Sequence, residues 1–180
     1  ELEKQGYMVI LGQPRDDHDY LARCLLSFKQ QGVAGVIYLD ADTTSNALPA
    51  ALQACPLPLV AVSQTPLSGH HDQVVRDNRQ AASIAARYLI ERGHRYIAYI
   101  GGQDNDLIRQ QRLLGLYSTL EKNGMTVREE FAPACSDNTQ AASIATRQLL
   151  EKNNAITALL CHSPDAMIGC LSGIHQVGRT

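Results

Sequence analysis

The chain has 180 residues, of which 44% are hydrophobic, and its 16 basic and 18 acidic side chains give a net charge of −2. This length fits one ordinary domain or two small lobes, and the apolar content is sufficient for a buried core. The charge argues against nucleic-acid binding by this chain itself, because phosphate backbones require clustered Lys and Arg, and no apolar run is long enough to span a membrane.

Short apolar runs rich in β-branched residues alternate with amphipathic stretches along the whole chain. The predicted strands are residues 7–12, 33–39, 58–62, 73–75, 96–100 and 157–161, with a weak strand at 129–132. The predicted helices are residues 17–31, 44–54, 78–92, 107–123, 139–153 and 165–177. Because the strands are apolar on both faces, we expect an α/β fold with parallel sheets covered by helices and joined by right-handed crossovers.

A sequence repeat indicates two lobes. The segment QAASIAAR at 80–87 recurs as QAASIATR at 140–147, and each copy leads through Leu and Glu to an Ile-led strand. The alternative is chance similarity between two helices that both need small residues against a sheet. Under either interpretation, each helix places an Ala-rich face on a parallel sheet. We place the boundary near Gly93–His94, which gives an N-terminal lobe of residues 1–94 and a C-terminal lobe of residues 95–180.

The two ends predict a fragment of a longer chain. Residues 1–6 have the charges and the glycine stop of a helix C-terminus, but no helix start precedes them. The last predicted helix closes at Gly178 without the further strand that a doubly wound lobe would add. We therefore expect both lobes to be truncated.

The five cysteines are Cys24, Cys55, Cys135, Cys161 and Cys170. Their odd number and the absence of a CxxC pair speak against a disulfide framework or a zinc site. In apolar surroundings a free thiol behaves as a small hydrophobe, so reduced, buried cysteines are expected. This usage indicates a reducing cytoplasm.

Several segments in combination resemble the lactose-repressor (LacI) family of bacterial transcription regulators. The sequence reads VRDN at 75–78, then an Ala-rich helix, GHR at 93–95 and IAYIGG at 97–102, where the family has a short strand, Asp-Asn, a helix, "GH(R)xIA" and a strand ending in Gly-Gly. RLLG at 112–115 resembles the RxxG piece of the family's next helix, and residues 158–169 resemble the strand and helix after it. Four positions also resemble the maltose-regulon repressor branch: Gln103, Leu107, Arg109 and Arg112.

This resemblance implies two Rossmann-like lobes, as in type I periplasmic binding proteins, with a small effector bound between them. It also implies a homodimer and an N-terminal helix-turn-helix head that contacts operator DNA. We expect the head, the hinge helix and a C-terminal part that carries an acidic ligand contact to lie outside these 180 residues. The resemblance calls for no cofactor, no metal and no catalytic residue.

Asp77 lies between a predicted strand and the helix that opens at Asn78. One interpretation is helix capping, which an Asp or Asn fills well and which contributes about 1 kcal/mol. The resemblance instead places an Asp here in the ligand cleft, where its carboxylate can accept protons from sugar hydroxyls. The two roles are compatible if Asn78 takes one and Asp77 the other.

Arg109 and Gln110 are candidates on the helix that follows Gly101–Gly102. The family often shows R-x-R-x-x-G, whose first Arg contacts ligand, whereas this sequence has Gln110 at the aligned position. The ligand contact could therefore come from Arg109 after a small helix rotation, or from Gln110 itself. For Arg112, a structural ion pair or helix cap is the favoured interpretation.

The remaining candidates follow strands at their carboxyl ends, where open parallel sheets bind ligands. Ser163 precedes a predicted helix and could donate to a sugar hydroxyl. Gln13, Asp40 and Ser63 follow the first three strands and are candidates by position alone. We interpret His162 as a satisfied loop residue.

These patterns predict the effector-binding core of a transcriptional repressor, with a sugar or sugar phosphate as effector. The alternative is a secreted solute-binding protein of the same architecture, against which the free-looking cysteines and the lack of a visible signal peptide speak. A nucleotide-using enzyme is the least favoured class, because the loop 101–106 matches neither GxGxxG nor GxxxxGK[ST].

Overall fold

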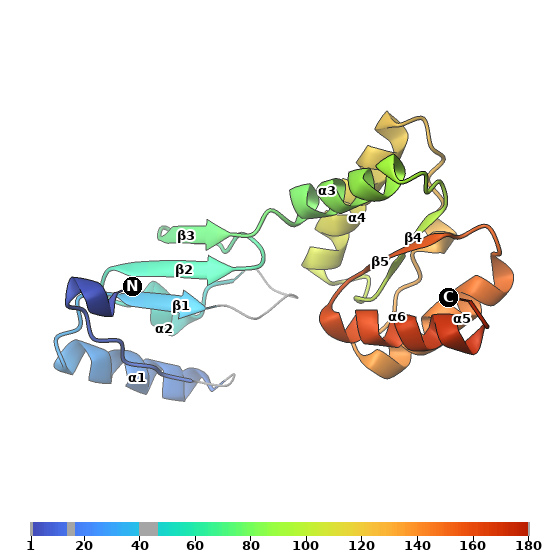
Figure 1. Ribbon diagram of the computed structural model, residues 1–180. Coiled ribbons are helices and arrows are strands. Elements are labelled where there is room, and N and C mark those ends of the chain that lie inside the picture. The colour runs from blue at the N-terminus through green and yellow to red at the C-terminus, as the bar shows by residue number, and fades with distance from the viewer. Residues whose placement is uncertain (1, 14–16, 40–46, 180) are drawn as a thin grey trace. The chain divides into compact units, whose positions relative to one another are not determined.

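The computed structural model describes residues 2–13, 17–39 and 47–179 and divides into two compact units (Figure 1). Among the described residues, the first unit extends to Val75 and the second begins at Arg76. The sequence placed the lobe boundary later, between residues 94 and 95. The difference concerns one helix, 78–91, which packs with the second unit.

The first unit contains a parallel three-stranded sheet in the order β1-β2-β3. Its elements are η1 (Glu3–Gln5), α1 (His18–Gln30), β1 (Val36–Leu39), α2 (Ala50–Gln53), β2 (Leu59–Ser63) and β3 (Asp72–Val75). Val36 pairs with Leu59 and Val60 with Asp72. All of these strands were predicted from their apolar composition.

The core of the first unit lies on one face of this sheet. Leu21 and Leu25 of α1 pack with Leu52 of α2 against Ala61, which is fully buried in β2. Asp17 caps α1 through a hydrogen bond from the Tyr20 N–H at 2.8 Å. This pairing of a capped amphipathic helix with a sheet is the arrangement that the sequence predicts.

Three predicted elements differ from the structure. Residues 7–12 form no strand, and Met8 and Leu11 are exposed, because β-branched composition stabilises a strand only when a neighbour pairs with it. Residues 129–132 contain the 3₁₀ helix η2 (Glu129–Phe131) instead of a weak strand. The helix predicted at 44–54 begins only at Ala50 within the described residues, since Pro49 disfavours helical backbone at the residue before it.

The second unit contains β4 (Ile97–Ile100) and β5 (Ala158–Cys161), a parallel pair in which Tyr99 lies opposite Leu160. Its helices are α3 (Asn78–Glu91), α4 (Leu107–Lys122), α5 (Thr139–Lys152) and α6 (Pro164–Gln176). Helices α3 and α4 lie on one side of the pair and α5 and α6 on the other (Figure 1).

Strand β4 is buried on both faces, as its uniformly apolar sequence predicts. Ile97 and Tyr99 pack with α3 and α4, whereas Ala98 and Ile100 pack with α5 and α6. All four side chains are at most 4% exposed. The two-faced burial explains why this strand has no polar alternation.

The sequence repeat corresponds to a repeated helix contact. A Cβ added at Gly115 of α4 would lie 2.2 Å from the Arg79 carbonyl oxygen at the start of α3. A Cβ added at Gly169 of α6 would lie 2.3 Å from the carbonyl oxygen of Thr139, the residue that corresponds to Arg79 in the second copy. Each repeat helix therefore lays its first turn directly on a glycine of the next helix, and this contact places α3 in the second unit.

Replacing either crossing glycine should destabilise the protein. Gly115→Ala and Gly169→Ala should each lower the free energy of unfolding by about 1–3 kcal/mol, because the methyl group meets backbone rather than a movable side chain. Helix propensity alone would favour Ala by about 1 kcal/mol, so the sign of the change is informative.

Urea unfolding measures this effect, and Leu114→Ala is the matched control, since Leu114 is 57% exposed beside Gly115. The control should change stability by no more than about 0.5 kcal/mol. A stabilised Gly115→Ala protein would show that the two helices do not cross at this distance.

Candidate functional site

The carboxyl edge of β4 and β5 gathers the polar groups of the second unit. Helices α4 and α6 begin just after these strands end, and α3 and α5 run back toward the start of the strands, so they begin at the same edge. Arg112 of α4 confirms this, because it donates to Asn78 Oδ1 at 3.3 Å and to the carbonyl oxygen of His162. This edge is where parallel α/β sheets bind ligands.

Each of the four helices is capped at this edge by the side chain of the residue that directly precedes it. Asp77, Asp106, Asn138 and Ser163 accept hydrogen bonds from backbone N–H groups three residues on, at 2.7, 2.9, 2.9 and 3.1 Å. Helix N-termini carry partial positive charge, which favours anionic or hydroxyl-rich groups nearby. The edge is therefore polar and suited to a hydrogen-bonding metabolite.

Gly101 and Gly102 let the chain turn close to His162 after β4. Both have positive φ, +107° and +78°, which side-chain-bearing residues rarely adopt. A Cβ at Gly101 would lie 2.6 Å from the Cβ of His162. Backbone conformation and lack of space therefore both explain why glycine occupies these two positions.

A group of polar side chains surrounds His162, which is 8% exposed. The Tyr99 hydroxyl lies 2.7 Å from His162 Nδ1, and His162 Nε2 lies 3.5 Å from Asp106 Oδ2. Burial lowers the pKa of His162, although the Asp106 carboxylate acts in the opposite direction. Burial raises the pKa of Tyr99 to about 12, so its hydroxyl keeps its proton and can donate to Nδ1 of a neutral imidazole.

Arg109 is a buried structural cation in this unit. Its side chain donates to the carbonyl oxygens of Gly101 at 3.0 Å and Ala132 at 2.5 Å, and the residue is 3% exposed. Its Nε also lies 3.6 Å from Asp104 Oδ1. These contacts hold the two loops that border the edge, so Arg109 positions the edge.

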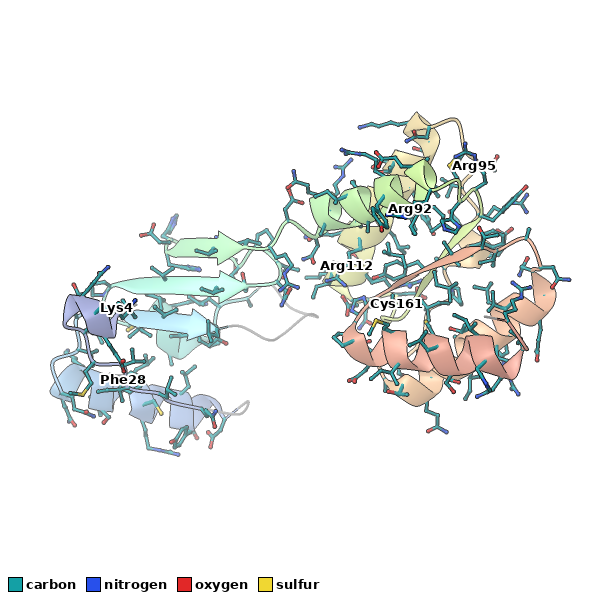
Figure 2. The ribbon with its side chains drawn as sticks, in the orientation of Figure 1. Lys4, Phe28, Arg92, Arg95, Arg112 and Cys161 are labelled. Carbon is teal, nitrogen blue, oxygen red and sulfur yellow. The ribbon has the colours of Figure 1, made fainter. Side chains whose placement is uncertain are left out.

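Arg112 of α4 connects the start of α3 to the residue that follows β5, through hydrogen bonds to Asn78 and His162. Figure 2 labels Arg112, which belongs to α4, and Cys161, the last residue of β5; Arg112 donates to the carbonyl oxygen of His162, the residue after Cys161. Because its Nε contacts Asn78, Arg112 also fixes the start of the helix that Asp77 caps.

The structure brings three predicted ligand residues to this edge. Asp77 is exposed and uses Oδ1 as the α3 cap, which leaves its other oxygen able to accept from a ligand hydroxyl. Ser163 caps α6 and donates to Asp137 Oδ1. Gln110 is exposed and donates to the Asp104 carbonyl oxygen at 2.8 Å. Their contact with a ligand stays a prediction.

Arg109, the fourth predicted ligand residue of the second unit, is buried and donates to carbonyl oxygens of the edge loops, so its contact with a ligand also stays a prediction. The other predicted ligand residues belong to the first unit or lie outside the described residues. Ser63 ends β2, is 6% exposed, and donates to the Thr65 carbonyl oxygen at 2.6 Å. Because its proton is used in this bond, its hydroxyl oxygen could only accept a hydrogen bond from a ligand. Gln13 is exposed after the segment that forms no strand. Asp40 falls outside the described residues.

Sequence reasoning missed Tyr99, Asp106 and Asp137. The signal for Asp106 was present, because an Asp just before a helical pattern is a common N-cap. Tyr99 was assigned to a buried strand without a polar role. Its partner His162 is distant in sequence, and only the pairing of β4 with β5 brings the two together.

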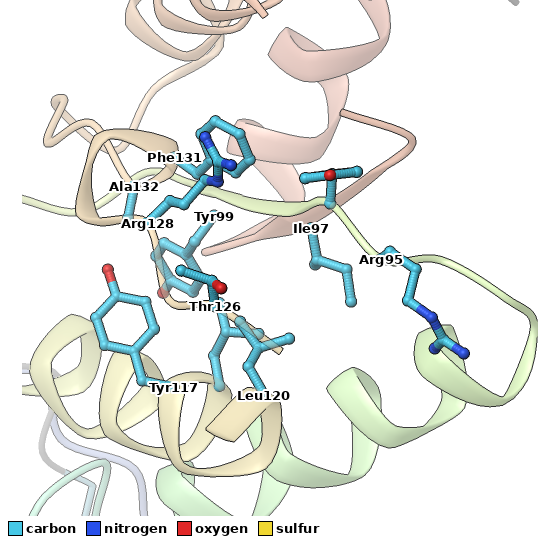
Figure 3. Close-up of a pocket in the computed structure, with 11 residues that line it drawn as sticks. Arg95, Ile97, Tyr99, Tyr117, Leu120, Thr126, Arg128, Phe131 and Ala132 are labelled. Carbon is cyan, nitrogen blue, oxygen red and sulfur yellow. The ribbon is translucent and has the colours of Figure 1, made fainter. Parts of the chain in front are cut away.

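A small pocket behind Tyr99 is too small for a metabolite. Tyr117 and Phe131 line it together with Tyr99 (Figure 3), and its volume of about 10 Å³ admits about one water molecule. Among residues 2–13, 17–39 and 47–179, no cluster of three or more His, Cys, Asp or Glu could hold a metal ion. No helix in these ranges has the length and apolarity needed to cross a membrane.

Comparisons with known proteins match this chain over nearly its whole length. A family model described as "Periplasmic binding proteins and sugar binding domain of LacI family" matches residues 1–180. The maltose regulon regulatory protein MalI of Escherichia coli (strain K12) is 32% identical over 178 residues, which are 99% of this chain and 52% of that protein. The transcriptional repressor PurR of Aliivibrio salmonicida is 25% identical over 97% of this chain and 53% of its own length.

Among solved structures, the complex of transcriptional regulator CelR with cellobiose aligns with a TM-score of 0.77 and 27% identity. The alignment covers 99% of this chain and 55% of that one. The chain spans about half the length of the curated relatives that it matches.

Removing the Arg109 side chain should damage the fold. Arg109→Met leaves two carbonyl oxygens in buried residues without their donor and should lower the free energy of unfolding by about 2–4 kcal/mol. The measurement is urea unfolding, with the exposed neighbour Gln110→Ala as a control expected within about 0.5 kcal/mol. A stable Arg109→Met protein would instead support the ligand contact that the sequence suggests.

Stability should fall with acid through His162. The pKa of His162 in the folded protein lies below the ordinary 6.5. Just below pH 6.5, the unfolded chain therefore binds a proton at His162 that the folded chain does not bind. The free energy of unfolding should therefore fall as pH drops through 6.5 and level off below the folded pKa. His162→Gln should flatten that part of the profile.

The experiment is urea unfolding of both proteins from pH 8 to pH 5, together with an NMR titration of the His162 ring proton. A His162 that titrates at or above pH 6.5 in the folded protein would contradict the expected direction.

Proposed function

Because the chain belongs to the family of periplasmic binding proteins and sugar-binding domains of LacI-type regulators, we propose that it is the effector-binding core of a cytoplasmic transcriptional repressor. The effector is a sugar or sugar phosphate. Operator DNA is contacted by a helix-turn-helix head outside these residues, and the full protein acts as a homodimer. The observation that carries the proposal is the family match over the whole chain.

The chemistry of the carboxyl edge supports a sugar as effector. Asp77 offers an exposed carboxylate oxygen, and Ser163 and Gln110 offer further polar groups on neighbouring helix starts. Sugar hydroxyls are recognised by donors and acceptors of this kind. The capped helix N-termini at the same edge would also accept a phosphate group.

Binding alone is sufficient for the proposed activity. A ligand shifts a two-state protein when it binds one state better than the other, and no covalent step is needed. Among the described polar groups of the edge, His162 and Tyr99 are buried and hydrogen-bonded to each other, so they position the edge. The protein is therefore proposed to be a sensor and not an enzyme.

A solute-binding protein is the second candidate, because the family description covers periplasmic binding proteins as well. The two candidates differ in what precedes the core in the gene. A helix-turn-helix would support the repressor, and a signal peptide would support solute transport.

The test uses the full-length protein and its own operator in a fluorescence-polarisation assay with a broad panel of sugars and sugar phosphates that includes maltose, cellobiose and glucose 6-phosphate. At least one sugar or sugar phosphate should change operator affinity by about tenfold, within the usual range of allosteric coupling. No response to any sugar or sugar phosphate of a broad panel would refute the proposed effector class.

Asp77→Asn tests whether the effector binds at this edge. The amide keeps the helix cap, since Asn caps as well as Asp, but it loses the charged acceptor. The effector Kd should rise by about tenfold, measured by isothermal titration calorimetry with the active sugar. Glu91→Gln, which removes an exposed carboxylate from the other end of α3, is the matched control and should bind as the parent does.

A further inference from the structure

The loop that leads into α5 brings an exposed carboxylate to the carboxyl edge of the β4–β5 pair. The Cys135 N–H donates to the Gly102 carbonyl oxygen at 3.2 Å, and Gln103 Nε2 donates to Ser136 Oγ at 3.0 Å. These two bonds attach residues 135 and 136 to the turn that follows β4. Asp137, the next residue, is exposed and directly precedes the residue that caps α5. Its neighbours in the chain therefore hold Asp137 at the edge.

Asp137 is hydrogen-bonded to Ser163, the residue that caps α6. The Ser163 hydroxyl accepts from the Ala166 N–H at 3.1 Å and donates to Asp137 Oδ1. A serine hydroxyl has one proton, so Ser163 has no proton left to donate to a ligand. Asp137 uses Oδ1 in this bond, which leaves Oδ2 able to accept. Toward a ligand, the two side chains therefore act as hydrogen-bond acceptors.

This acceptor pair distinguishes between the two effector classes that the proposed function leaves open. A sugar hydroxyl donates a proton, whereas phosphate oxygens accept and carry negative charge, which an adjacent carboxylate repels. Arg109 and Arg112, two cations of this edge, direct their guanidinium groups at backbone carbonyl oxygens. The helix N-termini alone would accept either class, so the carboxylate of Asp137 favours a hydroxyl over a phosphate.

We propose that the effector is an unphosphorylated sugar and that Asp137 is a further residue in contact with it. One sugar hydroxyl donates to Asp137 Oδ2, and Ser163 positions the carboxylate through its hydrogen bond to Oδ1. Asp77 binds a different hydroxyl, because it precedes a different helix, α3. The inference rests on the proposed function and names the effector class within it.

The test measures sugar binding to the full-length protein by isothermal titration calorimetry. The probes are glucose, maltose and cellobiose, their 6-phosphates, and the monodeoxyfluoro derivatives of each neutral sugar, extended to any other sugar that the operator assay identifies. The neutral sugar that binds should do so more tightly than its 6-phosphate. Fluorine has nearly the size of a hydroxyl but cannot donate, so one derivative should lose about tenfold to hundredfold in affinity, as loss of a hydrogen bond to a charged group predicts.

Asp137→Asn shows whether that hydroxyl contacts Asp137. The amide oxygen can still accept from Ser163, but the NH2 group then faces the ligand and cannot accept. The variant should bind the neutral sugar about tenfold more weakly. The fluorine substitution that weakens binding to the parent should have little further effect in the variant, because both changes remove the same hydrogen bond. A purely structural role of Asp137 would weaken all derivatives alike.

Glu121→Gln removes an exposed carboxylate near the C-terminus of α4 and is the matched control, which should bind every probe as the parent does. Three results would overturn the inference and leave the proposed function intact: equal affinity of Asp137→Asn and the parent, losses that add for every fluorinated derivative, or a 6-phosphate that binds more tightly than its neutral sugar. Absence of binding by every sugar and sugar phosphate would instead contradict the proposed function, and the inference with it.

Discussion

The parallel pairing of β4 with β5, which helices cover on both faces, is the constraint on which the second unit depends. A parallel pair needs a crossover for every strand, and each crossover helix runs back along the sheet. All four helices therefore begin at one edge, where their capping side chains come together. The glycine crossings at Gly115 and Gly169 let each pair of helices approach closely enough to cover its face of the sheet.

Charge at this edge is used mainly to hold the backbone in place. Arg109 and Arg112 direct their guanidinium groups at carbonyl oxygens of the loops and strand ends. Burial is the main cause that lowers the pKa of His162, the two fixed cations act in the same direction, and Asp106 and Asp137 act against them. Neutral His162 can accept from Tyr99 on one ring nitrogen, so burial and hydrogen bonding act together to fix one geometry of the edge.

The parts of the fold that were predicted are those that local sequence determines. Strands β4 and β5 follow from apolar runs bounded by glycine or polar residues, and the helix starts follow from capping residues such as Asp77. The segment 7–12 has the same composition but no pairing partner in the structure, which composition cannot reveal. The burial of Arg109 also depended on a distant residue, Ala132, and the two hydrogen-bond partners of Arg112 lie far from it in sequence.

The glycine pair after β4 restricts how the effector preference that we propose for this edge can be altered. Because Gly101 and Gly102 have positive φ and lie against His162 and Arg109, neither position can acquire a side chain that reads a new ligand. Diversity must come instead from the first residues of the helices, where Asp77 and Gln110 are exposed. Libraries that aim at a new ligand should therefore vary the first residues of the helices and keep the Gly101–Gly102 turn unchanged.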